Sequence, residues 1–230
     1  LADQAKGQAD GVLLADGTEV FCDYVVPACD MSVTFGRLLP REKMGSLLRQ
    51  MYEDRRAYPV YNTFQTAMAV DSENPLETET IWNCPELIFT KGMSERVTVK
   101  SYAYEPGFAP AGKQLIQTLQ GGSEEVYSYW IRLYQDPVAY QRQKSLLAER
   151  TREMLEEHFP ALRGRLRVLD AWTPMTYTRY CSAYKGFYQA FSISKYSAKL
   201  PYPSAYVEGV ENVVLAGQWL NPPGGLPGSA

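Results

Sequence analysis

The sequence predicts an α+β fold, a mainly antiparallel sheet flanked by helices. Alternating apolar and polar residues, the pattern of strands with one buried face, cluster between Asn62 and about Gln120. Apolar residues at helical spacing occur on both sides of this stretch, after Pro40 and after Pro137. Because the strands cluster and the helices lie elsewhere, an α+β domain is favoured over alternating βαβ units.

The region before the sheet predicts a hairpin, a strand and a helix. Asp16-Gly17 divides the run VLLADGTEV (residues 12–20) into two short strands, joined by a type I′ turn. The run DYVVP (residues 23–27) predicts a strand. After Pro40, apolar residues at helical spacing predict a helix, namely Met44, Leu47, Leu48 and Met51.

The central and later regions predict further strands and a long helix. A helix is expected from Val138 to Phe159, because Asp136-Pro137 opens it and Pro160 stops it. The expected strands are TFQTAMAV (63–70), PELIFT (85–90), VTVKSYAYE (97–105), KQLIQTLQ (113–120), RLRVLDAW (165–172) and NVVLAG (212–217).

Composition excludes several classes of partner. A net charge of -3 leaves no electrostatic footprint for nucleic acid or anionic lipid. The first residues are unlike a signal peptide, and no apolar run approaches membrane-spanning length. We therefore expect a cytoplasmic protein without a transmembrane segment, while peripheral membrane contact stays open. The 17 tyrosines favour a binding surface, because a tyrosine buries an apolar body and keeps a polar tip.

The sequence gives little support for a metal site or for a catalytic nucleophile. The four cysteines, Cys22, Cys29, Cys84 and Cys181, are scattered and are interpreted as reduced small hydrophobes, so no metal site is expected. The one histidine, His158, is interpreted as a helix cap. A hydrolase that uses Cys181 or His158 is kept as an alternative.

Three glycine-rich or tyrosine-rich stretches have both structural and functional interpretations. GFAPAGKQ (107–114) approaches a phosphate-binding loop, but Gln114 replaces the required hydroxyl, and a turn between strands is expected. TPMTYTRYCSAYKGFYQAF (173–191) is either an aromatic core patch or a cavity wall. VVLAGQWLNPPGGLPGSA (213–230) is either a tight connection or a loop that approaches a cofactor.

Three stretches together resemble the phytoene desaturase-like branch of the FAD-dependent flavin amine oxidase superfamily. They are ADGVLLADGTEVFCDYVVPACD (9–30), the tyrosine-rich stretch 173–191 and the closing run 213–230. By this resemblance the closing run contacts flavin through Gly217, Gln218, Pro222, Gly224, Gly225, Pro227 and Gly228. Pro223 departs from the pattern, since a proline lacks a backbone donor. The resemblance also implies a substrate cavity lined by Tyr177, Arg179, Tyr180, Tyr188 and Trp219.

The resemblance further implies an organisation into parts. The family's G-x-G-x-x-G fingerprint, which holds the pyrophosphate of FAD, does not occur in this sequence. We therefore expect a fragment: residues 1–30 and 207–230 as strips of an FAD-binding domain, and 31–206 as the substrate-binding domain. The missing FAD-binding half would be its partner, and FAD would be absent from the fragment.

The implied activity is hydride transfer between an apolar, isoprenoid-type small molecule and flavin, or isomerisation with reduced flavin. The cofactor performs the difficult step, and no residue stands out as a general base. The tyrosine content would also suit a more polar substrate. The alternative from another class is a non-catalytic module that binds an apolar ligand or a protein through its tyrosine-rich face.

Overall fold

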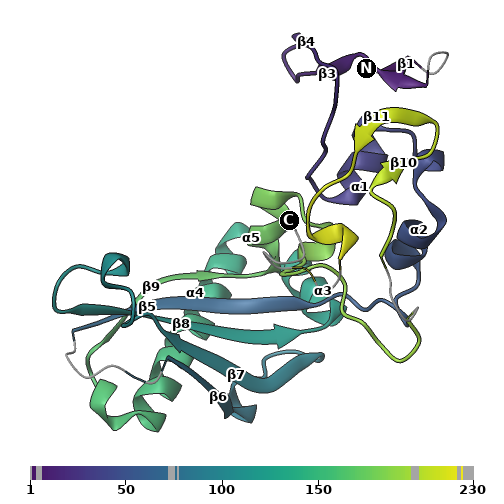
Figure 1. Cartoon of the computed structure of the whole chain (residues 1–230). Helices are drawn as coiled ribbons and strands as arrows, with labels where there is room; N and C mark the ends of the chain where they lie inside the picture. The colour runs from purple at the N-terminus through teal and green to yellow at the C-terminus, as the bar shows by residue number, and fades with distance from the viewer. Residues whose placement is uncertain are drawn as a thin grey trace. The chain divides into compact units, whose positions relative to one another are not determined.

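The computed structural model describes residues 2–3, 7–71, 76, 78–197, 202–221 and 224. It confirms the α+β class with an antiparallel sheet flanked by helices (Figure 1). The chain divides into two compact units, which we call unit 1 (residues 1–61 and 179–230) and unit 2 (residues 62–178). No helix among the described residues is long and apolar enough to cross a membrane. The boundaries expected at residues 30 and 206, between strips of a cofactor domain and a substrate-binding domain, stay a prediction.

Unit 2 contains a five-stranded sheet in the order β6-β7-β8-β5-β9, with every neighbouring pair antiparallel. The strands are β5 (Asn62–Asp71), β6 (Glu79–Asn83), β7 (Met93–Ser101), β8 (Lys113–Gly122) and β9 (Leu166–Trp172). Asn62 of β5 lies opposite Gly122 of β8, so these two central strands pair along their whole length. The predicted clustering of strands is therefore confirmed.

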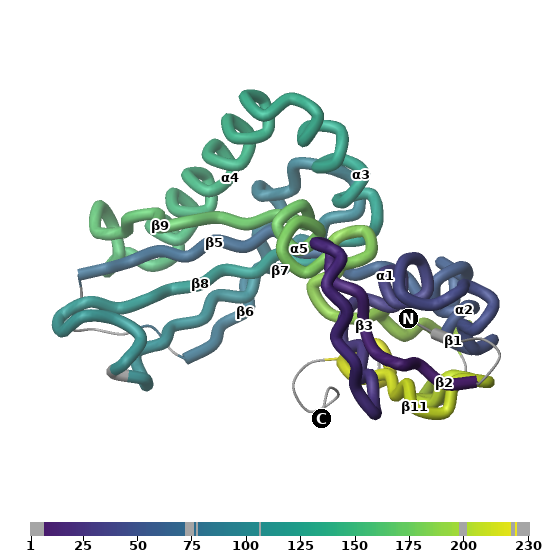
Figure 2. The backbone as a smooth tube through the Cα atoms, turned by 90° about the horizontal axis from the view of Figure 1, so that it is seen from above, coloured from purple at the N-terminus to yellow at the C-terminus, as the bar shows by residue number. Residues whose placement is uncertain are grey.

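Two helices cover the same side of this sheet (Figure 2). They are α3 (Glu124–Leu133) and α4 (Pro137–His158). The Asp136 carboxylate caps α4 by accepting hydrogen bonds from the backbone N–H groups of Val138 and Ala139, as the predicted helix start requires. Alternate residues of β5 face the helices and join two apolar clusters, which include Phe64 with Trp130, and Met68 with Leu155.

Two expectations for unit 2 need correction. PELIFT was expected as a strand, but Pro85–Leu87 forms a 3₁₀ turn. The strand in this region is β6, which ends at Asn83, before the turn. The apolar residues of PELIFT matched a strand pattern because Leu87 is buried, although it lies in the turn. Pro85 has no N–H to donate to a neighbouring strand. The helix α3 was not predicted as an element, although Val126 and Trp130 are buried at helical spacing.

The stretch GFAPAGKQ is a turn between strands, as expected. Pro106–Phe108 forms a 3₁₀ turn, and β8 begins at Lys113. A phosphate loop needs a helix N-terminus at this place. A strand follows instead, so the structure removes the phosphate-binding interpretation.

Unit 1 contains short strands and two helices. The strands are β1 (Ala2–Asp3), β2 (Gln8–Ala9), β3 (Gly11–Leu13), β4 (Glu19–Phe21), β10 (Tyr206–Val207) and β11 (Val210–Val214). The helix α1 (Met31–Val33) continues into a π-helical turn at Thr34–Leu38, and α2 (Ser46–Glu53) confirms the helix expected after Pro40. A further helix, α5 (Pro174–Cys181), contains the boundary between the units.

The predicted hairpin forms, but its turn differs from the expected type I′. Of the two central turn residues, only Gly17 has a positive φ, of 86°, whereas a type I′ turn also requires one at Asp16. The N–H of Gly17 donates to the carbonyl of Leu14, and the N–H of Leu14 donates to that of Thr18. This pattern is typical of a type I turn followed by a left-handed glycine, which lets Asp16 keep negative φ.

The side chain of Asn212 joins the two ends of the described chain in unit 1. Its Oδ1 accepts a hydrogen bond from the N–H of Ala9 at 2.7 Å, and its Nδ2 donates to the carbonyls of Ala9 (2.7 Å) and Asp23 (2.8 Å). The amide thus accepts and donates hydrogen bonds as a backbone peptide group would, and it connects β11 to β2 and to residues 23–27. Because Asn212 is 9% exposed, water does not readily replace these bonds.

Replacing Asn212 with alanine is expected to destabilise unit 1. The change removes three hydrogen bonds to the backbone, two of them buried, so the free energy of unfolding should fall by about 2–3 kcal/mol. Urea denaturation followed by circular dichroism measures this. Glu211→Ala, at an exposed position of the same strand, is the matched control. Equal loss in both variants would contradict the role given to the Asn212 amide.

Candidate functional site

The strand expected at residues 23–27 does not form; this extended segment instead makes an isolated parallel bridge to β11 in unit 1. Val25 and Val213 form a parallel bridge. The N–H of Val25 donates to the carbonyl of Asn212, and the N–H of Val214 donates to that of Val25, each at 3.0 Å. The carboxyl ends of both segments therefore reach the same edge. In sheets with parallel strands, this edge is where ligands bind.

Gly217 lies directly beyond β11 in a conformation that favours glycine. Its φ is 103°. A Cβ at this position would lie 3.3 Å from Cδ1 of Trp219 and 3.4 Å from the carbonyl oxygen of Ala28. The Trp219 indole N–H donates to that same carbonyl at 3.4 Å. The backbone at Gly217 thus passes close to the end of the neighbouring strand segment, where a side chain would crowd it.

Asp30 is a fully buried carboxylate at the end of the other segment. Its Oδ1 accepts hydrogen bonds from the N–H of Ser32 at 2.8 Å and from the hydroxyl of Tyr52 at 3.0 Å. Its Oδ2 accepts from the N–H of Tyr184 at 2.7 Å. Burial, together with the Asp30 charge, raises the pKa of the Tyr52 hydroxyl well above its usual value. Asp30 was not among the predicted site residues, although an aspartate before Met31-Ser32 is an N-cap signal.

Aromatic rings pack around these two Asp30 partners. Tyr52 meets Phe191 edge to face with ring centroids 4.8 Å apart, and Phe191 meets Phe187 at 4.6 Å. Phe187 lies 6.1 Å from Trp219, which connects the cluster to the strand ends. The structure therefore makes this part of the tyrosine-rich stretch a packed core, with Phe187 and Phe191 each 1% exposed.

Two cavities lie in unit 1 beside these residues. One, of about 190 Å³, is lined by Met31, Phe35, Tyr52, Glu53 and Tyr184 among others. The other, of about 450 Å³, has the size of a small-molecule site and includes Lys43 and Leu215 in its lining. The predicted cavity residues are not part of either lining.

The predicted flavin-contacting residues are partly described. Gly217, Gln218 and Gly224 lie in the described chain, whereas Pro222, Gly225, Pro227 and Gly228 lie outside it, as does Pro223. Gly224 has a φ of 82°, and its N–H donates to the carbonyl of Asn221 at 2.8 Å. A Cβ on Gly224 would lie 2.9 Å from Oε1 of Gln218, so the loop folds back on this side chain.

The predicted substrate-binding residues divide between the two units. Tyr177 belongs to unit 2, and Arg179, Tyr180, Tyr188 and Trp219 belong to unit 1. The Arg179 guanidinium lies 5.0 Å from the ring centre of Tyr180, which is 72% exposed. Tyr188 packs 6.4 Å from the ring of Tyr61, and Trp219 is 6% exposed. Their role in substrate binding stays a prediction.

Tyr177 ends a chain of hydrogen bonds across the sheet of unit 2. The Tyr102 hydroxyl donates to Oε1 of Gln117, and Nε2 of Gln117 donates to Oε1 of Gln65, at 2.6 and 2.7 Å. Nε2 of Gln65 and the indole N–H of Trp172 both donate to the Tyr177 hydroxyl, at 2.6 and 3.0 Å. These bonds fix polar side chains in one arrangement on β8, β5 and β9.

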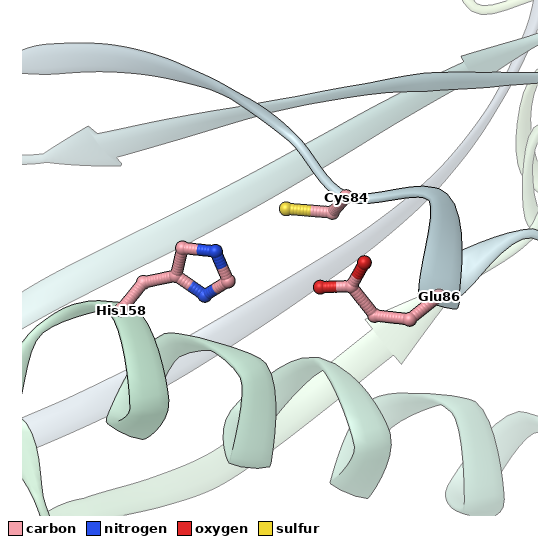
Figure 3. A group of neighbouring side chains, drawn as sticks. All are labelled: Cys84, Glu86 and His158. Atoms are coloured by element: carbon pink, nitrogen blue, oxygen red, sulfur yellow. The ribbon is translucent and has the colours of Figure 1, made fainter.

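A third group of side chains, in unit 2, includes one of the four cysteines. All four are free, but Cys22 and Cys181 are exposed and only Cys84 is fully buried. Figure 3 shows the Cys84 thiol and the Glu86 carboxylate pointing toward the ring of His158. His158 ends α4, as its interpretation as a cap requires, and its Nδ1 lies 2.9 Å from the carbonyl of Met154. The scattered sequence positions concealed this cluster.

The sequence matches no family model and no curated protein. One solved structure similar to this chain is the crystal structure of an oxidoreductase from Methanosarcina mazei, with a TM-score of 0.49 and 19% identity. The match covers 93% of this chain and 41% of that chain, so this chain spans less than half of that protein. A likeness this distant carries no argument about activity.

The Tyr52 hydroxyl is expected to make stability fall at alkaline pH. Unfolded tyrosine ionises near pH 10, whereas folded Tyr52 keeps its proton to a higher pH. Its contribution is therefore complete below about pH 10 and is lost as the pH rises toward the folded pKa. Tyr52→Phe should lower stability at neutral pH by about 1–2 kcal/mol and make the alkaline fall shallower.

Urea denaturation at a series of pH values tests this expectation. Tyr206→Phe is the matched control, because Tyr206 is 74% exposed in the same unit. Identical alkaline slopes for the wild-type protein and Tyr52→Phe would show that Tyr52 does not contribute as inferred.

Proposed function

We propose that this chain is the substrate-binding portion of an FAD-dependent oxidoreductase of the phytoene desaturase-like branch. Bound FAD would supply the hydride acceptor, or in its reduced form support isomerisation. The chain's own residues would hold the substrate, approach one edge of the flavin and exclude water.

The parallel pairing of Val25 with Val213 is the observation that carries this proposal. It brings residues 23–30 and 213–219 to one edge, as expected for two strips of a single cofactor domain. Dinucleotide-binding folds place their ligand at the carboxyl ends of parallel strands. Gly217 lies at that end and leaves its backbone without a covering Cβ.

The described residues fit one part of FAD and not the whole cofactor. Gly217 and Gly224 have the positive φ angles that a close backbone approach to a ligand uses. The pyrophosphate requires a glycine-rich turn at a helix N-terminus, and no G-x-G-x-x-G occurs in this sequence. The proposal therefore includes a further segment that supplies the pyrophosphate site.

The tyrosine content supports an otherwise apolar substrate that carries a polar group. Each of the 17 tyrosines offers an apolar ring and a polar hydroxyl, which suits a cavity wall that receives both kinds of group. We propose an otherwise apolar substrate with at least one hydroxyl or carbonyl group.

Flavin binding tests the proposed class. Expressed from its complete reading frame, the protein is expected to purify with about one FAD per chain, visible in its absorbance spectrum. Gly217→Val should remove the flavin, because the new side chain would meet Trp219 and strain the backbone. Gly17→Val is the matched control: Gly17 also has positive φ in unit 1, but a Cβ there would meet nothing within 4 Å.

Two outcomes would count against the proposal. If the protein expressed from the complete reading frame contained no flavin, the proposed class of FAD-dependent oxidoreductase would be wrong. Stoichiometric flavin in the 230-residue chain alone would show that no additional pyrophosphate-binding segment is needed, since this chain is expected to bind FAD weakly or not at all.

The exposed tyrosines of unit 1 favour the second candidate, a non-catalytic binding module. Tyr180, Tyr202 and Tyr206 are 72%, 56% and 74% exposed, and tyrosine is common where proteins meet partners. A module of this kind would bind its ligand without flavin. The flavin spectrum of the complete protein therefore distinguishes the two functions.

A further inference from the structure

The cluster of Cys84, Glu86 and His158 combines three kinds of metal-binding atom. One sulfur, one carboxylate oxygen and one ring nitrogen all lie within 4.8 Å of one another. Cys84 precedes the 3₁₀ turn Pro85–Leu87, Glu86 lies in it, and His158 ends α4. We infer that these three side chains bind one Zn²⁺ ion.

The donor set and its spacing suit zinc. Zinc takes thiolate, imidazole and carboxylate ligands in tetrahedral sites, in which neighbouring ligand atoms lie about 3.5 Å apart. The three atoms therefore need to approach one another only slightly. Glu86 is exposed, so its side chain can adjust more easily than the buried Cys84.

The three donors are available to a metal. Among the described residues, no hydrogen bond or ion pair engages the Cys84 sulfur, the Glu86 carboxylate or Nε2 of His158. The Nδ1–H of His158 donates to the carbonyl of Met154, which leaves the lone pair on Nε2. Histidine ligands of metals commonly donate their other N–H to a backbone carbonyl in this way.

The surrounding structure holds the ligands in place. The N–H of Cys84 donates to the carbonyl of Glu95 at 2.7 Å, and Arg150 donates to the carbonyl of Glu86 at 3.1 Å. The ring of Trp82 meets that of His158 edge to face at 5.1 Å. An ion here would connect the turn at residues 85–87 to the end of α4 and stabilise unit 2 by binding the folded state.

Coordination requires the Cys84 thiolate and releases the thiol proton to solvent, with no change of oxidation state. Three protein ligands leave a fourth position, which water can occupy from the side of the exposed Glu86. A nucleophilic role for Cys84 fits less well, because its side chain is 0% exposed and a substrate could not reach the sulfur.

Zinc titration of the chelator-treated 230-residue chain tests the inference. In competition with a chromogenic chelator, the wild-type chain is expected to bind one equivalent of Zn²⁺ and to gain thermal stability. Glu86→Gln should weaken binding by more than about tenfold without affecting the fold, because the exposed carboxylate has no partner to lose. Cys84→Ser and His158→Gln should remove the site.

Cys181→Ser is the matched control, since Cys181 is an exposed free cysteine in the other unit. With Co²⁺, wild-type and Cys181→Ser chains should show thiolate-to-cobalt charge-transfer absorption that Cys84→Ser lacks. Unchanged zinc affinity in Glu86→Gln, or loss of the absorption in Cys181→Ser, would overturn the site. These readouts are independent of flavin.

Discussion

The buried Asp30 carboxylate is the interaction on which the arrangement of unit 1 depends. A charge without exposure must be matched by donors, and its three donors come from the start of α1, from α2 and from the turn at Tyr184. Two residues earlier, the carbonyl of Ala28 accepts from Trp219. The edge beyond the parallel segments is thus held by polar contacts between residues distant in sequence, and the aromatic cluster packs on the same residues.

Polar side chains perform the same task elsewhere in the protein. Asn212 connects β2, β11 and residues 23–27, while Gln65 and Gln117 connect neighbouring strands of unit 2. Buried amides are costly unless all their bonds are made, so they specify one partner arrangement more strictly than apolar contacts do. The strand ends of unit 1 and the sheet of unit 2 are therefore both held by fixed hydrogen bonds.

The sequence predicted the elements whose signals are local. The long helix has its own cap at Asp136, and β5 and β8 alternate clearly, so each was expected close to its observed bounds. The prediction for PELIFT was wrong because the sequence pattern around a buried Leu87 is the same for a strand and for a 3₁₀ turn. The parallel pairing of Val25 with Val213, and the meeting of Cys84 with His158, depend on tertiary contacts between distant segments, which composition and periodicity do not report.

The hydrogen bonds between Tyr102 and Tyr177 all point the same way. Each amide receives a proton donor on one side and offers its own N–H on the other, so no single amide can turn over without breaking its neighbours' bonds. The dipoles of these hydrogen bonds therefore align in one direction along this face of the sheet. Loss of the Tyr102 hydroxyl would remove the first donor of this series and leave Oε1 of Gln117 without that bond.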